Sequence, residues 1–315
     1  MSKGAILVGE PMGLFIAQSE GPLDEVSGYT MAVAGAEFNV AVGLARLEQP
    51  VTYLTRLGND PFGKRIVKVL GDNKIGSEFV SYSTERSTGF MLKGKVSVGD
   101  PEIFYFRKGS AASTLSKEDV DRVDFSGYGY LHLTGILPAL SQTTREASFY
   151  LIEKARKSGL TVSFDPNLRP QLWPDQQTMI KTVNELAGLA DYVFPGEAEG
   201  EILCGTRDPE AIGRFYLNLG AKAVVTKVGS KGAYLMTAEG GEMVPGFKVE
   251  KVVDTVGAGD GFAAGILSAL MEGKDLREAV RRGNAVGAIQ VTCIGDNDGL
   301  PTRKELAAFM GQEKL

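Results

Sequence analysis

The sequence contains very little histidine and cysteine, and this shortage argues against several kinds of catalytic site. Among 315 residues there are one histidine, His132, and two cysteines, Cys204 and Cys293. A zinc centre needs several histidine or cysteine ligands, and a Ser-His-Asp triad needs a histidine base. Neither cysteine has the spacing of a metal ligand, and His132 lies in an apolar run that favours a core position. Zinc-dependent and triad chemistry are therefore poorly supported.

Long apolar runs and an excess of basic residues are also missing. No apolar run approaches the roughly 18 residues that a membrane-spanning helix needs, and residues 1–10 lack the pattern of a signal peptide. The net charge of -5 argues against a general nucleic-acid-binding surface. These patterns predict a protein that binds neither membrane nor nucleic acid. Because the two cysteines are interpreted as reduced thiols, we also expect a cytoplasmic location.

What the sequence does contain is an alternation of short β-branched runs with helical patterns. The runs that resemble strands are 130–134, 160–164, 192–194 and 223–227, and the helical patterns are 142–157, 176–189, a segment after Gly259, and 276–290. Strands that alternate with helices predict βαβ units and a mostly parallel sheet with helices on both faces. The expected fold class is therefore a three-layer α/β/α core.

Two stretches interrupt this alternation. Residues 12–33 and 88–111 contain short alternating strands with no helix between them, and 90–96 and 103–106 are predicted to be antiparallel partners. We interpret the two stretches as one small β-sheet lid that is discontinuous in sequence. Because open sheet edges tend to pair, we expect a homo-oligomer, a dimer or higher, assembled through the lid. The rest of the chain would form the core: residues 1–11, 34–87 and 112–315.

The segment with the clearest chemical pattern is Val252–Phe262. A β-branched run leads into the turn Gly257-Ala258-Gly259, and apolar residues then recur at helical spacing. A helix that begins there would present free backbone N–H groups and the positive end of its dipole to an anion. Asp260, in or just before the first turn, would be placed to take a proton from an attacking hydroxyl. On this segment alone, a plain helix N-cap at Asp260 is an equally good interpretation.

The motif Asp254-Thr255-Val256-Gly257-Ala258-Gly259-Asp260 resembles the signature of the ribokinase-like (PfkB) carbohydrate kinases. Other landmarks of that family occur in the right order: Gly35-Ala36-Glu37-Phe38-Asn39, Gly58-Asn59-Asp60-Pro61-Phe62-Gly63 and Lys227-Val228-Gly229-Ser230-Lys231-Gly232. The resemblance covers nearly the whole chain, including both lid stretches. It implies the ribokinase-like fold and a kinase that uses ATP and Mg²⁺.

The resemblance also implies roles for particular residues. Asp260 would be the catalytic base, and the amides of Gly257-Ala258-Gly259 would form the anion hole. Gly35 and Asn39 would hydrogen-bond substrate hydroxyls. The nucleotide would lie against Lys227, Gly229, Gly232, Gly257 and Gly259, with Asn284 at the edge of the adenine.

The metal-associated positions depart from the family pattern at one point. Glu199 aligns with a magnesium-associated glutamate that acts through water, but Gly196 stands where the family's Asn-x-x-Glu motif has asparagine. Mg²⁺ keeps most of its waters and needs few protein ligands, so this loss is tolerable. Several members of the family bind a monovalent cation near the position of Asp254, and the resemblance leaves a potassium ion open here. Ala36 replaces a glycine of the first landmark.

Two segments bear on the substrate. The first is Phe104–Ala112: if it is a strand, Tyr105 and Arg107 share a face of the lid, where they are suited to bind a carboxylate. Arg169 follows a predicted strand end and is a second candidate cation. Both segments resemble those of the 2-keto-3-deoxygluconate kinases, which implies transfer of the ATP γ-phosphoryl group to O6 of 2-dehydro-3-deoxygluconate. Ordinary surface ion pairs are the alternative interpretation of these arginines.

Other functions remain open beside a sugar-acid kinase. A fructokinase or another neutral-sugar kinase would share most of the motifs, and a non-catalytic nucleotide or sugar sensor would share the fold. Gly58–Lys64 nearly matches a P-loop, but Arg65 stands where that motif needs serine or threonine. Gly257-Ala258-Gly259 is not followed by the spacing of a dinucleotide fingerprint.

Overall fold

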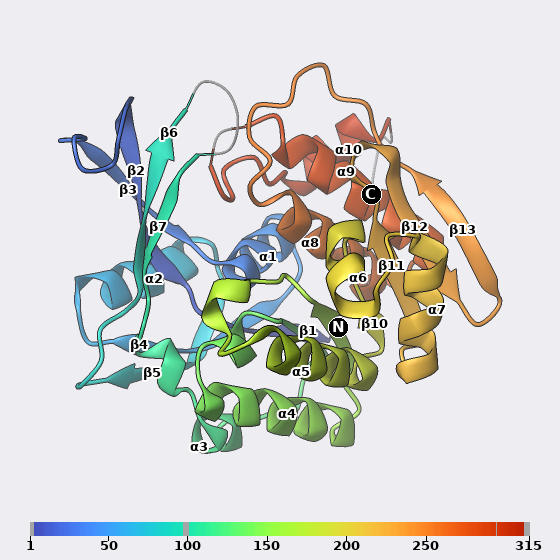
Figure 1. Cartoon of the computed structure of the whole chain (residues 1–315), viewed down its shortest axis with the longest axis horizontal. Coiled ribbons are helices and arrows are strands. Elements are labelled where there is room, and N and C mark those ends of the chain that lie inside the picture. Colours follow the sequence, from blue (N-terminus) through green and yellow to red (C-terminus); the bar gives the residue numbers. More distant parts are fainter. Residues whose placement is uncertain (1–2, 97–100, 294, 312–315) are drawn as a thin grey trace.

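The computed structural model describes residues 3–96, 101–293 and 295–311, and its main feature is a nine-stranded sheet (Figure 1). The strand order is β13-β12-β11-β10-β9-β8-β1-β4-β5, and every neighbouring pair is parallel except the two pairs that involve β12. These strands are β1 (Gly4–Val8), β4 (Val51–Gly58), β5 (Gly76–Ser83), β8 (Tyr128–Thr134), β9 (Thr161–Asp165), β10 (Tyr192–Val193), β11 (Ala223–Lys227), β12 (Gly232–Thr237) and β13 (Gly240–Pro245).

Helices cover both faces of this sheet, which confirms the predicted three-layer class. Side chains of β1 alternate between the faces: Ala5 and Leu7 belong to one buried core, and Ile6 and Val8 belong to the other. The first core lies under α1 (Ala36–Arg46), α2 (Pro61–Asp72), α8 (Ala258–Met271), α9 (Leu276–Gln290) and α10 (Arg303–Phe309). The second lies under α3 (Lys117–Asp121), α4 (Gln142–Lys157), α5 (Gln176–Leu189), α6 (Glu197–Cys204) and α7 (Pro209–Leu219).

Local sequence explains where several helices begin. Ser141, Asp175 and Asp275 each lie at an N-cap, and each side chain accepts a hydrogen bond from the backbone N–H three residues further on. These caps place α4, α5 and α9 on the residues predicted from the sequence. Short 3₁₀ turns complete the connections at Ala112–Thr114, Leu137–Ala139, Pro170–Leu172 and Gly229–Lys231.

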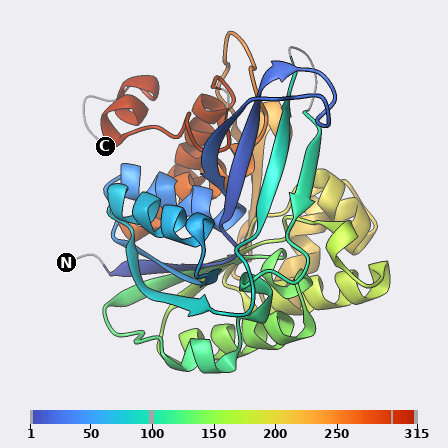
Figure 2. The same ribbon diagram turned by 90° about the vertical axis from the view of Figure 1, so that its left-hand side faces the viewer.

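Four strands form a second, smaller sheet that stands beside the large one (Figures 1 and 2). They are β2 (Met12–Glu20), β3 (Tyr29–Ala34), β6 (Phe90–Lys95) and β7 (Ile103–Phe106), in the order β3-β2-β6-β7. The predicted antiparallel pairing of β6 with β7 is confirmed, whereas β2 and β6 run parallel, so the small sheet is mixed. Residues 97–100 of the predicted lid stretch lie outside the described residues. The division into core and lid stays a prediction.

The strand order departs from simple βα alternation at one further place, which the sequence analysis did not predict. β11, β12 and β13 follow one another as antiparallel strands with no helix between them. Glycines make the tight turns: Gly232 has a φ of 111°, and a methyl group placed on it would lie 2.2 Å from the Val244 carbonyl oxygen. Gly240 has a φ of 140°. The two extra strands widen the sheet beside α9.

The strand order reverses direction between β1 and β8. From β1 the sheet extends through β4 and β5, and from β8 it extends the other way through β9, β10 and β11. Ligands of open α/β sheets bind beyond the carboxyl ends of the strands at such a point. The small sheet begins directly after β1, and β2 starts only four residues beyond Val8. Within the described residues, no helix combines the length and apolar character needed to cross a bilayer.

Candidate active site

Two cavities of similar size meet beyond the carboxyl ends of the strands. The first has a volume of about 430 Å³ and the second about 420 Å³. Lys227, Thr255 and Gly259 line both, so the two spaces share a wall at the start of α8. The first cavity collects most of the predicted site residues: Gly35, Asn39, Tyr105, Arg107, Arg169, Glu199, Gly257 and Asp260. The second collects Ala258, Gly229, Gly232 and Asn284.

At the start of α8, no side chain of the described residues caps the backbone N–H groups. Gly257 is the N-cap, with a φ of 77°. A methyl group on Gly257 would lie 2.1 Å from the Asp296 carbonyl oxygen, so only glycine fits there. A methyl group on Gly259 would meet only Lys227 Nζ, at 3.8 Å. The first turn of α8 therefore faces the shared wall of the cavities without a blocking side chain.

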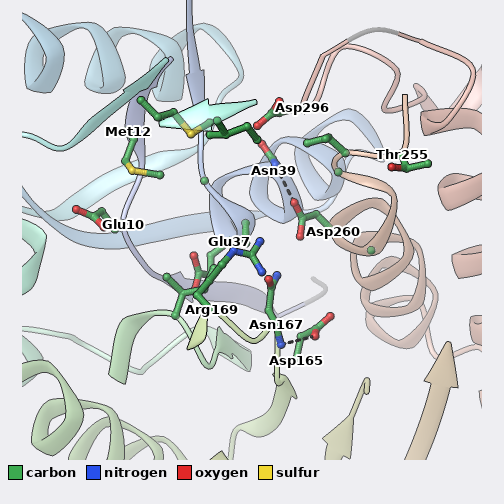
Figure 3. Close-up of a pocket in the computed structure, with 18 of the residues that line it drawn as sticks. Glu10, Met12, Glu37, Asn39, Asp165, Asn167, Arg169, Thr255, Asp260 and Asp296 are labelled. Carbon is green, nitrogen blue, oxygen red and sulfur yellow. Dashed lines mark hydrogen bonds between the residues drawn. The ribbon is translucent and has the colours of Figure 1, made fainter. Parts of the chain in front are cut away.

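Asp260 lies in the first turn of α8, half-buried, with its carboxylate in the first cavity (Figure 3). Because the N-cap is Gly257, Asp260 does not cap the helix, which removes the alternative interpretation raised from the sequence. Burial raises the pKa of Asp260 to about 7, and the nearby Asp165 carboxylate adds to the rise, while the Asn39 hydrogen bond and the Arg169 charge oppose it. A carboxylate with such a pKa can act as a base near neutral pH.

Asn39 holds Asp260 from the side of α1. Its Nδ2 donates a 2.8 Å hydrogen bond to Asp260 Oδ2. Its Oδ1 accepts a 2.9 Å bond from Asn297 Nδ2, which fixes the amide with its N–H₂ group toward Asp260. Gly35 precedes α1 with a φ of 146°, and a methyl group there would lie 2.8 Å from the Glu10 carbonyl oxygen. The substrate contact assigned to Asn39 from the sequence stays a prediction, and the structure shows that its amide contacts the candidate base.

Lys227 stands at the end of β11, between the two cavities. Its Nζ donates a 2.7 Å hydrogen bond to Asp165 Oδ2 and lies 4.0 Å from Glu199 Oε2. Burial raises the pKa of Asp165 to about 6, against the lowering effect of Lys227. Glu199 accepts hydrogen bonds from the N–H groups of Leu168 at 3.0 Å and Gly196 at 2.7 Å. One lysine and two carboxylates thus meet beside the start of α8.

Arg107 and Tyr105 both line the first cavity, but Arg107 already has an anionic partner. Its Nε donates a 2.7 Å hydrogen bond to Glu10 Oε2, and its Nη2 forms an ion pair with the same oxygen. Both side chains of this pair are buried. The Arg107 guanidinium also lies 5.7 Å from the centre of the Tyr105 ring. A bound anion would therefore share Arg107 with Glu10, a residue that the sequence analysis treated only as part of the N-terminus.

Arg169 and Asn167 belong to the loop after β9 and point into the first cavity (Figure 3). Asn167 has a φ of 37°, unusual for a residue with a side chain, and its N–H donates a 3.1 Å bond to Asp165 Oδ1. Arg169 Nη1 donates to the Leu168 carbonyl oxygen at 2.9 Å. The strained loop thereby directs a guanidinium toward the space in front of Asp260.

The second cavity is lined mainly by glycines and apolar side chains. Gly229 and Gly232 lie at one side, and Phe247, Phe262 and Val291 add apolar surface. Asn284 is buried in the wall, where its Nδ2 donates to the carbonyl oxygens of Val244 and Pro245 at 3.0 and 3.2 Å. A flat heterocycle fits such a lining.

Several residues near the site were not singled out from the sequence. Glu37 is buried, accepts a 2.5 Å bond from Thr134, and has an Oε2 without a hydrogen-bond partner in the described residues. Lys93, from β6, forms ion pairs with Asp254 and Asp296 behind the 254–257 loop. The signal that could have identified it is a lysine directly after the apolar residues Phe90–Leu92 of β6. Asp254 itself lines neither cavity.

His132 lies away from both cavities, in the interior of the sheet. It is fully buried, and its Nδ1 is 2.9 Å from Ser163 Oγ. Burial lowers its pKa to about 3, so the ring is neutral at ordinary pH. The predicted core position is confirmed, although Nε2 has no partner within the described part of the chain.

Comparison with known proteins places this chain in a family. Residues 3–303 match the model of the pfkB family of carbohydrate kinases. The chain is 47% identical over 315 residues to the 2-dehydro-3-deoxygluconokinase of Bacillus subtilis (strain 168), an alignment that covers 100% of this chain and 97% of that protein. The chain therefore belongs to the pfkB family of carbohydrate kinases, as its motifs predicted.

Solved structures agree with this assignment. The crystal structure of a PfkB protein from Polaromonas sp. JS666 has a TM-score of 0.89 and 43% sequence identity, and the match covers 97% of this chain and 99% of that one. A fructokinase double mutant from Vibrio cholerae O395, in its fructose, ADP and potassium ion bound form, has a TM-score of 0.87 and 29% identity, with 98% of each chain covered. The predicted ribokinase-like α/β fold and the carbohydrate kinase class are confirmed.

Proposed function

We propose that this kinase transfers the γ-phosphoryl group of ATP to O6 of 2-dehydro-3-deoxy-D-gluconate. The observation that carries the proposal is the position of Asp260, at the uncapped start of α8 where the two cavities meet, with Arg107, Tyr105 and Arg169 lining the same cavity as its carboxylate. The relative from Bacillus subtilis is named for this substrate. The sugar acid would occupy the first cavity and ATP the second.

Asp260 acts as the base in the proposed reaction. It takes the proton of the sugar hydroxyl as the hydroxyl oxygen attacks the γ-phosphorus, and the bond from that phosphorus to the β–γ bridging oxygen breaks, so that ADP leaves with the electron pair. Negative charge spreads over the transferring group, and the free amides of Gly257-Ala258-Gly259 stabilise it. Lys227 Nζ, close to Gly259, adds positive charge on the nucleotide side.

Magnesium fits the carboxylates of the first cavity, because carboxylate oxygens are the ligands that Mg²⁺ prefers. Asp165 and Glu199 line that cavity on the side of Lys227, apart from the proposed base. Both Glu199 oxygens already accept backbone N–H groups, which favours contact with the metal through water. The described residues contain no cluster of three acidic, histidine or cysteine side chains that would hold a metal unaided. A bound Mg²⁺ would neutralise charge on the phosphates of ATP.

Two arginines that line the first cavity favour an acidic sugar as the substrate: Arg107, next to the small sheet, and Arg169, in the loop after β9. Arg107 is oriented by Glu10 and shares its charge with that carboxylate, so Arg169 would carry a larger part of the carboxylate contact than the sequence indicated. A fructokinase activity is the second candidate, because the Arg107–Glu10 pair leaves this end of the cavity nearly neutral and the Vibrio cholerae structure contains fructose.

A substrate panel with ATP and Mg²⁺ tests the proposal. We expect phosphorylation of 2-dehydro-3-deoxygluconate and little turnover of fructose or ribose. Turnover of fructose without turnover of the sugar acid would establish the fructokinase instead. Binding of ATP with no turnover of any sugar would favour a sensor.

Replacement of the arginines separates their contributions. Arg169→Ala removes a charge-assisted contact worth about 1.5–3 kcal/mol and should reduce kcat/KM for the sugar acid more than for fructose. Arg107→Ala should do the same and also leave Glu10 buried without its cation. Arg214→Ala, which removes an exposed ion pair with Glu210, is the matched control. An unchanged preference between acid and neutral sugar in both variants would contradict the carboxylate contact.

We also expect a homo-oligomer assembled through the small sheet. Phe104 and Phe106 of β7 are 54% and 45% exposed, which is a large apolar exposure for an edge strand. Sedimentation velocity on the wild-type chain and on Phe104→Ser would measure this assembly. Cytoplasmic location likewise stays a prediction from the cysteine content.

A further inference from the structure

Lys93 is a buried lysine that connects the small sheet to the loop before α8. It lies on β6, is 3% exposed, and reaches out of the small sheet to two carboxylates of the larger body. Its Nζ is 3.0 Å from Asp254 Oδ2 and 2.9 Å from Asp296 Oδ1. Burial alone would lower the pKa of Lys93, but Asp296 and Asp254 raise it above its ordinary value, so the side chain is charged.

The two residues that Lys93 contacts also support the proposed anion hole, Asp254 through its carboxylate and Asp296 through its backbone carbonyl group. Asp254 Oδ1 accepts a 3.0 Å hydrogen bond from the N–H of Val256, the residue before Gly257. The carbonyl oxygen of Asp296 lies against Gly257, where a methyl group would meet it at 2.1 Å. Gln290 Nε2 donates to the Val256 carbonyl oxygen at 3.2 Å from the other side. The charge beside Asp254 therefore acts on the loop that ends in the Gly257 amide.

The contacts of Asp254 do not fit the monovalent cation that the family resemblance left open. The oxygen Oδ1 takes the Val256 N–H, and Oδ2 takes Lys93 Nζ together with a longer 3.4 Å contact from the Gly295 N–H. An ammonium group carries the same single charge as a potassium ion and donates up to three hydrogen bonds. A second monovalent cation at the same oxygens would lie against the buried Lys93 charge, which is unfavourable.

We propose that Lys93 Nζ supplies the positive charge beside Asp254 in place of a monovalent cation, so that phosphoryl transfer by this kinase does not need potassium ions. Lys93 is a positioning residue in this scheme, because it touches neither cavity and acts through Asp254 and Asp296 on the Gly257 amide. Since Lys93 belongs to β6, its two ion pairs connect the small sheet to the loop that ends in the Gly257 amide. The inference rests on the kinase site, and not on the identity of the sugar.

The wild-type chain gives the first test. Phosphoryl transfer and the thermal unfolding midpoint are compared in KCl and in tetramethylammonium chloride at equal ionic strength, with ATP and Mg²⁺ present. We expect the same turnover and the same midpoint in both salts. Crystals soaked in thallium(I), an electron-rich substitute for potassium, should show no anomalous peak beside Asp254. Stimulation of the wild type by KCl, or a thallium peak at Asp254, would overturn the proposal.

A charge-free variant gives the second test. Lys93→Met keeps the length of the side chain but leaves Asp254 and Asp296 without their cation, so in tetramethylammonium chloride kcat should fall about tenfold to a hundredfold with little change in the KM for ATP. KCl should restore part of the turnover and raise the unfolding midpoint of this variant alone. Lys95→Met is the matched control, since Lys95 lies two residues further along β6 and is exposed.

The results that would refute the role of Lys93 differ from those expected if the proposed sugar is wrong. If 2-dehydro-3-deoxygluconate is the wrong sugar, turnover is low in every salt, while the unfolding midpoints and the thallium map still decide the role of Lys93. A Lys93→Met variant with full turnover and no response to KCl would refute that role. If this variant does not fold, the salt comparison and the thallium soak on the wild type give the answer without it.

Discussion

Asn39 Nδ2 and Asp260 Oδ2 are joined by a hydrogen bond of 2.8 Å, although the two residues are 221 positions apart in sequence and belong to different helices, α1 and α8 (Figure 3). This bond stabilises the ionised form of a carboxylate that burial would otherwise keep protonated. The pKa of this candidate base is therefore set by two opposing effects, burial and the Asn39 hydrogen bond, and both can be measured.

Asn39→Ala should move the pH profile of the enzyme. The variant loses the bond that lowers the pKa of Asp260, so the ascending limb of kcat/KM, which we place near pH 7 in the wild type, should shift to higher pH. Asn73→Ala serves as the control, because the Asn73 amide donates to the Val69 carbonyl oxygen at the end of α2. A profile that keeps its midpoint in Asn39→Ala would show that Asp260 is not the titrating base.

Asp260→Asn should remove the base while leaving the fold intact. General-base catalysis contributes about 10²–10⁴-fold, so kcat should fall by that factor, with ATP affinity retained. The free energy of unfolding, in contrast, should be higher in the variant than in the wild type near pH 7. In the wild type the folded-state pKa of about 7 exceeds the ordinary 3.8, so the free energy of unfolding falls as pH rises through this window.

Thermal or urea unfolding of Asp260→Asn between pH 4 and 8 checks that sign, because the variant lacks this loss and should be more stable than the wild type at the upper end. Wild-type turnover in the variant would exclude Asp260 as the base.

Gly257→Ala should specifically damage the proposed anion hole. The new methyl group meets the Asp296 carbonyl oxygen and strains a left-handed residue, so the amides move, and kcat should fall by about a hundredfold or more. Gly273, just after the other end of the same helix, also has a positive φ, of 74°, but open space around it. Gly273→Ala should cost about 1 kcal/mol of stability and leave turnover intact. Equal kinetics in the two variants would contradict the assignment of the hole.

His132→Asn should reduce the amount of unfolding free energy that the protein loses as pH falls. Burial lowers the folded-state pKa of His132 from 6.5 to about 3, so its contribution to the free energy of unfolding is complete above about pH 6.5 and is lost as pH falls. Urea titrations at pH 7.5 and 4.5 should show a smaller loss in the variant than in the wild type. Because His132 is the only histidine, an identical loss would mean that carboxylates alone account for acid unfolding.

The elements that the sequence predicted best are those with local signals. The segments 142–157, 176–189 and 276–290 have an N-cap residue and helical spacing, and 223–227 is a β-branched run, so each element lies where it was predicted. The β12–β13 pair was missed, because its antiparallel turns depend on the positive φ of Gly232 and Gly240 and not on a hydrophobic period.

The site could be predicted only as far as its motifs extend. The start of α8 and its Asp260 are contiguous in sequence, and their chemistry follows from that order. The partners of these groups come from remote elements: Glu10 pairs with Arg107 and Lys93 with Asp254 only because the small sheet is seated on the body. Such pairings depend on tertiary packing, which no local pattern of residues specifies.

The wall that both cavities share has a practical consequence for ligand design. Because Lys227, Thr255 and Gly259 border both spaces, a single compound that tethers a sugar acid to an adenine nucleotide through a short phosphate bridge would fill them end to end. Its second half would bind intramolecularly, at a high effective concentration set by the bridge. Such a bisubstrate inhibitor would select this enzyme over other ATP-dependent proteins through its sugar end.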